Sequence, residues 1–299
     1  MTYTASNGVS KKMKVGILGT GNIGTDLLVK ILRSDVLECG MFAGQNPDSE
    51  GIRKAKGLGV RTSSDSIAAF ENDPGCAEIV FDATSAEAHH RHAPVLKRLG
   101  KFVIDMTPSR IGKMCVPLLN LEACLNEPNI NMISCGGQAT TPIAQAIMSV
   151  HPDTSYIEIV GSVASRSAGI GTRNNIDEYT KATSDAIKFF TGVSRSKAII
   201  ILNPAEPPIF MHNTIYAEIK NPDMVAIARA VQIAVSNMQS YVPGYRLTLE
   251  PIYENGRVTI MNSVVGQGDF LPSYAGNLDI INCAAIVAAE AYARKNSTT

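Results

Sequence analysis

One cysteine stands in a sequence context that suits covalent chemistry. Cys135 follows the apolar run 130–134, which is typical of a buried strand, and it precedes two glycines. We predict that the glycines form a sharp turn and that a helix begins near Thr141, with Pro142 in its first turn. A thiol close to a helix N-terminus is favoured as the thiolate, and free N–H groups there can hold an oxyanion. Cys135 is therefore a candidate nucleophile; the alternative is a buried structural cysteine.

A second segment has the spacing of a phosphate-binding loop. Residues 19–24 read Gly-Thr-Gly-Asn-Ile-Gly, between an apolar run and a helical pattern. The first glycine permits a tight turn, the second lets the backbone approach a pyrophosphate, and the third lets the helix pack on the strand. The alternative is a plain strand-to-helix turn. The motif predicts a dinucleotide site but leaves NAD and NADP open, because Met41–Gly44, about 20 residues on, contain no acid for the ribose.

Several other polar residues are assigned no chemistry. His89, His90 and His92 lie in a helical pattern, where neighbouring residues point in different directions, so we expect a solvated helix face. Asp82 and Asp105 end apolar strands, and we expect them to cap the turns that follow. No histidine stands at metal-ligand spacing from a cysteine, so we expect no metal site.

Composition describes an ordinary globular protein. The 299 residues are 45% hydrophobic and 18% charged, enough for two domains with sizeable cores. Basic and acidic residues balance at 27 each, which gives no reason to expect nucleic acid or an anionic membrane as partner. No apolar stretch is long enough to span a membrane, and Met1–Lys12 resemble neither a secretory nor a transit signal. The six scattered cysteines fit a reducing compartment, so we expect a cytoplasmic protein.

The first part of the chain alternates between strand and helix patterns, as a parallel α/β sheet does. The predicted strands are Lys14–Leu18, Leu37–Ala43, Ala77–Ala83, Lys101–Asp105 and Ile130–Ser134, and the clearest helices are Ile23–Arg33 and Ala86–Leu99.

The pattern changes after Cys135. The predicted strands are Tyr156–Ala164, Lys197–Leu202, Ile209–Glu218, Arg246–Tyr253 and Arg257–Val265, with helices at Ile143–Val150, Ile176–Phe190, Met224–Tyr241 and Leu278–Arg294. Asn255 and Gly256 separate the last two strands, and Asn-Gly is the strongest short hairpin signal. We therefore expect an antiparallel or mixed sheet in this part.

Five ordered segments together resemble the acylating acetaldehyde dehydrogenases of meta-cleavage pathways. They read GTGNIGTDLL at 19–28, SCGGQAT at 134–140, SAGIGTR at 167–173, NPAEPP at 203–208 and AGNLDI at 275–280. The resemblance implies an α/β fold shared with glyceraldehyde-3-phosphate and aspartate-semialdehyde dehydrogenases. Residues 1–134 would form an NAD-binding Rossmann domain completed by the helix 277–299, and residues 135–276 an α+β catalytic and dimerisation domain.

The resemblance also implies roles for individual residues. Cys135 matches the nucleophile that carries the acyl thioester. The residues matched to NAD are Thr20, Gly21, Asn22 and Ile23, the loop Ser167, Ala168, Gly169, Ile170, Gly171, Thr172, Arg173, Asn174 and Asn175, and Asn277 beside the nicotinamide. Arg166 and Arg173 are either phosphate contacts or ordinary surface charges.

The chain departs from some relatives at a position where they carry Asp. Asn213 stands there, and an amide can hydrogen-bond but cannot act as a base. The neighbouring His212 would face the opposite side of a strand. The general base near Cys135 therefore stays unassigned.

The activity implied is oxidation of acetaldehyde or propanal to acyl-CoA, with NAD and coenzyme A, in aromatic or steroid catabolism. A 4-hydroxy-2-oxovalerate aldolase is the implied partner, with a homodimer of this chain inside a hetero-oligomer. Two alternatives remain: a semialdehyde dehydrogenase that uses phosphate, and a nucleotide-binding regulator in which Cys135 is inert.

Overall fold

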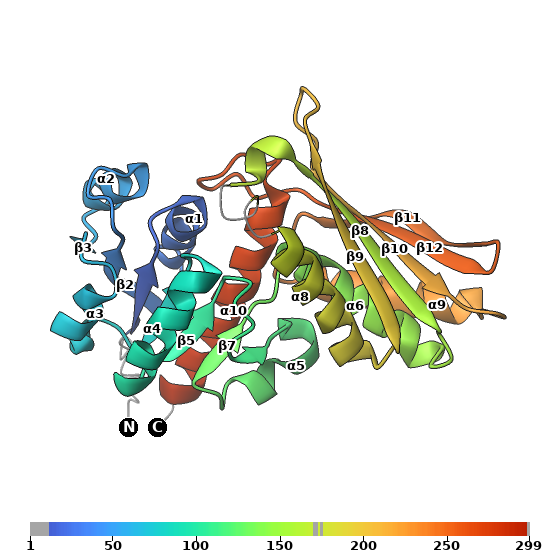
Figure 1. The fold of residues 1–299 in the computed structure, drawn as a ribbon, viewed down its shortest axis with the longest axis horizontal. Helices are drawn as coiled ribbons and strands as arrows, with labels where there is room; N and C mark the ends of the chain where they lie inside the picture. The colour runs from blue at the N-terminus through green and yellow to red at the C-terminus, as the bar shows by residue number, and fades with distance from the viewer. Residues whose placement is uncertain (1–11, 170–172, 174–175, 298–299) are drawn as a thin grey trace, which may run out of the picture.

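Two β-sheets stand side by side in the computed structural model, which describes residues 12–169, 173 and 176–297 (Figure 1). The first is a parallel seven-stranded sheet in the order β3-β2-β1-β4-β5-β7-β6. Its strands are β1 (Met13–Leu18), β2 (Leu37–Ala43), β3 (Thr62–Ser63), β4 (Ile79–Asp82), β5 (Phe102–Asp105), β6 (Lys113–Met114) and β7 (Asn129–Asn131). The predicted parallel α/β sheet is confirmed, and the two-residue strands β3 and β6 extend its edges.

Helices cover this sheet because its central strands are apolar on both faces, as parallel strands usually are. All four residues of β4 are buried, and so are all four of β5. The helices of this half are α1 (Asn22–Ile31), α2 (Glu50–Gly57), α3 (Ala68–Asn72), α4 (Ala86–Arg98) and α5 (Pro117–Cys124). The last helix, α10 (Gly276–Ser297), returns from the far end of the sequence and buries an alanine-rich side in the same core.

The second sheet is mixed and has five strands in the order β11-β12-β10-β8-β9, of which β8 and β9 are parallel neighbours. The strands are β8 (Tyr156–Ala164), β9 (Arg195–Asn203), β10 (Met211–Glu218), β11 (Tyr245–Glu254) and β12 (Arg257–Val264). Both Asn255 and Gly256 have positive φ, so the predicted hairpin is confirmed. Three helices pack on one face of this sheet (Figure 1): α6 (Cys135–Val150), α8 (Ile176–Thr191) and α9 (Met224–Gln239).

The start of α6 differs from the prediction. The helix begins at Cys135, not near Thr141, and the Ser134 hydroxyl caps it by accepting the N–H of Gly137 at 2.9 Å. Pro142 therefore lies inside the helix and cannot donate to the carbonyl one turn earlier. The adjacent carbonyl of Ala139 accepts hydrogen bonds from two side chains of the second sheet. These contacts fasten the middle of α6 to the second sheet.

Among the described residues, no helix is both long and apolar enough to cross a membrane.

Candidate active site

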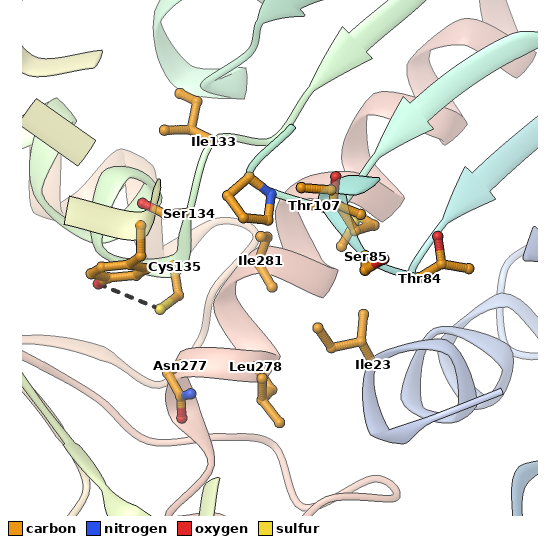
Figure 2. A pocket seen from close by; sticks show the side chains of 14 residues that line it. Ile23, Thr84, Ser85, Thr107, Ile133, Ser134, Cys135, Asn277, Leu278 and Ile281 are labelled. Atoms are coloured by element: carbon orange, nitrogen blue, oxygen red, sulfur yellow. Dashed lines mark hydrogen bonds between the residues drawn. The ribbon is translucent and has the colours of Figure 1, made fainter. Parts of the chain in front are cut away.

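A cleft opens beyond the carboxyl ends of β4, β5 and β7, where the turns that follow these strands meet α6, α8 and α10. Figure 2 shows Cys135 on one side of it, Ile23 and Thr84 on the other, and Asn277 and Leu278 of α10 between them. Ile23 belongs to the glycine-rich segment, and Thr84 follows β4. The cleft therefore brings three predicted site residues, Ile23, Cys135 and Asn277, to one place.

Cys135 is the first residue of α6 and is half-buried at the wall of the cleft. Its thiol Sγ lies 3.7 Å from the hydroxyl of Tyr179 on α8. Ser134, one residue earlier, is hydrogen-bonded to Thr183 of α8 at 2.7 Å between the two hydroxyl oxygens. Two side chains of α8 thus fix the backbone and the thiol of the candidate nucleophile.

Tyr179 is the site residue that sequence reasoning missed. It is 8% exposed and sits in a helix whose sequence gives no sign that one tyrosine faces a cysteine 44 residues earlier. A Cβ on Gly136 would lie 2.2 Å from the Tyr179 hydroxyl oxygen. Gly136 therefore leaves space for the Tyr179 hydroxyl while its own backbone is helical. The predicted sharp turn after Cys135 is wrong.

The ionisation of Cys135 also differs from the expectation. Burial raises the pKa of the thiol to about 11, and this outweighs the opposing hydrogen bonds from Tyr179 and from the N–H groups of Gly136 and Cys135 itself. Burial and the neighbouring Cys135 likewise hold the pKa of Tyr179 well above its ordinary value. Among the described residues that line the cleft, these two alone carry ionisable side chains, and the protonated thiol donates to the Tyr179 hydroxyl oxygen.

The glycine-rich segment has the geometry that a dinucleotide requires. Gly19 has φ of 114°, and a Cβ on Gly24 would lie 1.9 Å from the carbonyl oxygen of Gly19, so α1 packs directly on this turn. A Cβ on Gly21 would meet nothing within 4 Å. Gly21 also begins α1 without a side-chain cap, which leaves N–H groups for a phosphate. Contact of Thr20, Gly21, Asn22 and Ile23 with NAD stays a prediction.

The end of β2 explains the missing acid. A Cβ on Gly44 would lie 2.5 Å from the hydroxyl oxygen of Thr20, so no larger residue fits there without moving the loop. The same Thr20 hydroxyl lies 3.1 Å from the Ser49 hydroxyl. The polar side chains that these contacts place beside the end of β2 are thus neutral hydroxyls, and the choice between NAD and NADP stays open.

Asn277 lies in the first turn of α10 and is 2% exposed. Its side-chain oxygen is buried and has no hydrogen-bond partner among the described residues. A buried carbonyl oxygen beside a cleft needs a donor, and the amide of a nicotinamide is one. The residues present therefore fit the cofactor that the sequence suggests.

The loop predicted to contact NAD is described only in part. Ser167 and Ala168 are buried and Gly169 is exposed, whereas Ile170, Gly171, Thr172, Asn174 and Asn175 lie outside the described residues. The guanidinium of Arg173 donates to the carbonyls of Ala168 and Ser165 at 3.0 and 2.8 Å. Arg166 is exposed and forms an ion pair with Glu206 at 2.7 Å. In this structure Arg173 thus bonds within its own loop, and Arg166 pairs with the loop between β9 and β10.

Asn213 is buried on β10, and its amide donates to the side-chain oxygen of Asn262 at 2.8 Å. Its own side-chain oxygen, without a partner among the described residues, and the Tyr179 hydroxyl both lie within 4 Å of the point that a Cβ on Gly161 would occupy. His212 is exposed, as expected for its neighbour on a strand. The place where some relatives carry Asp therefore lies close to the thiol's hydrogen-bond partner.

The expected solvated histidine face is wrong for two of its three members. His89 and His92 are 0% and 5% exposed, and each ring places Nδ1 within 2.9 Å of the Asp82 carboxylate, while His90 is exposed. Residues three apart share a helix face, so His89 and His92 point the same way although their neighbours do not. Asp82 and Asp105 cap the turns that follow their strands, as predicted.

Comparisons with known proteins agree with this geometry. Residues 135–272 match the family model described as prokaryotic acetaldehyde dehydrogenase, dimerisation. The chain is 54% identical to an acetaldehyde dehydrogenase of Pectobacterium atrosepticum, over 94% of this chain and 96% of the relative. It is 50% identical to one of Spirochaeta aurantia, over 95% of this chain and 96% of that one.

Among solved structures, aspartate semialdehyde dehydrogenase II of Vibrio cholerae, complexed with ASA, has a TM-score of 0.66 at 15% identity. The match covers 95% of this chain and 99% of that one, and it confirms the predicted fold class. Because identity near 50% extends over nearly the whole length of the relatives, this chain belongs to the acetaldehyde dehydrogenase family.

Proposed function

We propose that this enzyme oxidises acetaldehyde, or propanal, to the acyl-CoA thioester through a covalent intermediate on Cys135, with NAD as hydride acceptor and coenzyme A as acyl acceptor. The observation that carries the proposal is the cleft itself. It places a thiol at the N-terminus of α6, with a tyrosine hydroxyl beside it, opposite Ile23 of the glycine-rich segment. The relatives' shared name supports the aldehyde as substrate.

The nucleotide would be held by Thr20, Gly21, Asn22 and Ile23 at its phosphates and by Asn277 at the nicotinamide, with the loop 167–175 as a second contact. Bound there, NAD supplies the acceptor for the hydride that leaves the aldehyde carbon. The open space at Gly21 and the unpartnered oxygen of Asn277 are the features that fit this cofactor.

The protein's own groups act on the sulfur and on the developing oxyanion. The Cys135 thiolate adds to the aldehyde carbon, and one C–S bond forms while the carbonyl oxygen becomes negative. The N–H groups of Cys135 and Gly136 hydrogen-bond to Sγ, and the Tyr179 hydroxyl stays protonated, so this corner stabilises negative charge.

Loss of hydride from the tetrahedral adduct leaves an acyl thioester on Cys135. The thiol of coenzyme A then attacks the thioester carbon, the bond to the Cys135 sulfur breaks, and the coenzyme's proton is released. Splitting oxidation from acyl transfer in this way is what the covalent nucleophile contributes. The base that first deprotonates Cys135 is left unassigned, since Asn213 cannot serve.

The proposal also assigns roles to the two domains, a cell compartment and a partner enzyme. Residues 1–134 with 277–299 would bind the nucleotide, and residues 135–276 would carry the chemistry and the dimer contact, in line with the family model's description. We place the enzyme in the cytoplasm, because all six cysteines are free thiols. A 4-hydroxy-2-oxovalerate aldolase as source of acetaldehyde, and a role in aromatic or steroid catabolism, complete the proposal.

The test follows NADH absorbance with acetaldehyde and NAD, in the presence of coenzyme A, of phosphate, or of neither. We expect sustained turnover with coenzyme A alone, and a Cys135→Ala variant that binds NAD normally but does not turn over. Turnover with phosphate instead would assign a semialdehyde-dehydrogenase type of reaction. NAD binding without turnover under any condition, together with an unreactive Cys135, would indicate a regulator.

A further inference from the structure

Three adjacent strands of the first sheet end in the same kind of residue. Asp82 of β4 pairs in register with Asp105 of β5, and Asp105 pairs with Asn131 of β7. Each side chain accepts the backbone N–H two residues further on, at 3.1, 2.8 and 2.9 Å in that order. The row of three therefore shapes three consecutive turns at one edge of the sheet.

Hydrogen bonds and close ion pairs connect the three side chains of this row inside the protein. The His89 ring places Nδ1 2.9 Å from the Asp82 carboxylate and Nε2 3.5 Å from the Asp105 carboxylate. Asn131 continues the link, because its amide donates to Asp105 at 2.6 Å and to the carbonyl of Thr107 at 2.9 Å. The three side chains of the row and His89 are at most 2% exposed. A single buried ring thus spans two of the three strand ends.

The three turns are walls of the active-site cleft. Thr84 follows Asp82, Thr107 follows Asp105, and Ile133 follows Asn131, and all three line the cleft with Cys135 (Figure 2). Ile133 has φ of 67°, a backbone conformation that costs a β-branched residue about 1–3 kcal/mol and persists only where the surroundings hold it. The side-chain oxygen of Asn131 accepts the N–H of Ile133. Two residues after Ile133, the candidate nucleophile Cys135 begins α6.

We propose that His89 is a positioning residue for the reaction: by bridging Asp82 and Asp105 it holds the turns before Cys135 and around Thr107 in register with the nucleotide side of the cleft. The inference rests on the proposed function, because it assigns His89 to the alignment of Cys135 with an aldehyde and a nucleotide. His89 itself touches neither the thiol nor the cleft.

The charges around the ring agree with a bridging role. His89 faces Asp82 of β4, Asp105 of β5 and the amide of Asn129 of β7, while His92 shares Asp82 with it from α4. A doubly protonated ring donates from Nδ1 to Asp82 and carries a positive charge that attracts both carboxylates. Burial alone would lower the pKa of His89, but the hydrogen bond to Asp82 and the charge of Asp105 outweigh it and raise the pKa. The bridge is therefore complete below that raised pKa and is lost as pH rises through it.

The test compares His89→Gln with His90→Gln, the exposed neighbour on the same helix. Glutamine can still donate to Asp82, but it is uncharged and cannot span both carboxylates. Because misplacement by about 1 Å can cost about 100-fold, we expect H89Q to lower kcat by about 10- to 100-fold. H90Q should stay within about twofold in both kcat and thermal midpoint.

Two readouts separate positioning from simple stability. Alkylation of Cys135 by iodoacetamide, followed at its own peptide by mass spectrometry, should change in folded H89Q by about threefold or more. The kcat ratio of wild type to H89Q should shrink as pH rises, since the wild type loses its bridge as well. Alkylation also tests the inference if the wild type has no dehydrogenase activity, so the two failures are distinguishable.

A folded H89Q whose kcat and alkylation rate both stay within about twofold of wild type would overturn the proposal. If H89Q does not fold, Asn129→Ala decides, because it removes only the half-buried amide 3.1 Å from Nε2 of the ring. We expect a loss of kcat of about three- to tenfold for N129A. No loss there would refute the bridge.

Discussion

Tyr179→Phe is the substitution that tests the chemistry of the cleft most directly. It removes the hydroxyl 3.7 Å from the Cys135 sulfur and leaves the buried ring in place. A hydrogen bond to a charged group contributes about 1.5–3 kcal/mol, which corresponds to about 10- to 150-fold in kcat/KM. The pKa of Cys135, raised to about 11 by burial, should rise further, because a donor to the thiolate is lost.

The assay follows kcat/KM together with iodoacetamide alkylation of Cys135 at pH 8. A higher thiol pKa lowers the thiolate fraction but makes each thiolate more nucleophilic, with a Brønsted slope of about 0.4–0.5, so alkylation should slow by only about 3- to 20-fold. Tyr253→Phe is the matched control, because Tyr253 lies near the end of β11 and its hydroxyl donates to the backbone carbonyls of Ile219 and Lys220 after β10. Alkylation and kcat/KM that are both unchanged in Y179F would refute the role of the hydroxyl.

A second variant checks the geometry behind this prediction. Gly136→Ala places a Cβ 2.2 Å from the Tyr179 hydroxyl oxygen but 3.1 Å from the ring carbon that carries it. G136A should therefore be destabilised by about 1–3 kcal/mol, the usual cost of overpacking, and part of this loss should be recovered in G136A/Y179F. A double variant less stable than G136A alone would show that the two groups do not collide.

Three further predictions concern stability and the nucleotide. Gly24→Ala should weaken NAD binding in a titration and lower the free energy of unfolding by about 1–3 kcal/mol, because its Cβ would lie 1.9 Å from the carbonyl oxygen of Gly19; unchanged affinity would contradict this. Although burial alone would raise the pKa of Asp82, hydrogen bonds from two histidines and a threonine lower it to about 2, so Asp82 stabilises the fold above pH ~4 and this is lost as pH falls toward 2. The difference in unfolding free energy between wild type and Asp82→Asn should shrink over that interval, and a constant difference would exclude the linkage. Lys30→Met leaves the buried Asp26 and Asp279 and the half-buried Asp269 without their shared cation and should cost about 3–5 kcal/mol in urea unfolding, against less than ~0.5 for the exposed Lys56→Met.

Most of the fold could be predicted because buried strands and helices show a pattern of apolar residues over short stretches of sequence. The strands of the first sheet are short apolar runs, and the hairpin at Asn255 is set by two adjacent residues that tolerate positive φ. The strands β3 and β6 have two residues each, too few for any periodicity. The start of α6 could not be predicted, because Pro142 usually marks a first turn, whereas here it lies inside a helix that side chains of β11 and β12 contact at Ala139.

The residues of the candidate site show the same difference between features set by neighbouring sequence and features set by distant contacts. Cys135 and the glycine-rich segment could be found because the context that makes them functional is contiguous in the chain. Tyr179 could not, because its role depends on how α8 packs against α6. The burial of His89 could have been suspected from its spacing to His92, but its second carboxylate partner comes from another strand.

The placement of α10 has a consequence for how the protein is made. N-terminal domains usually fold first as a chain is synthesised. Here the core beneath the first sheet takes Ile281, Ala284 and Ala288 from α10, so it stays open until that helix has left the ribosome. The same helix brings Asn277 to the cleft. A chain cut short before Gly276 thus lacks part of its core and part of its site together, and exposes apolar surface that cellular proteases and chaperones act on. Synthesis of α10 is therefore the step that commits the first half of the molecule to its fold.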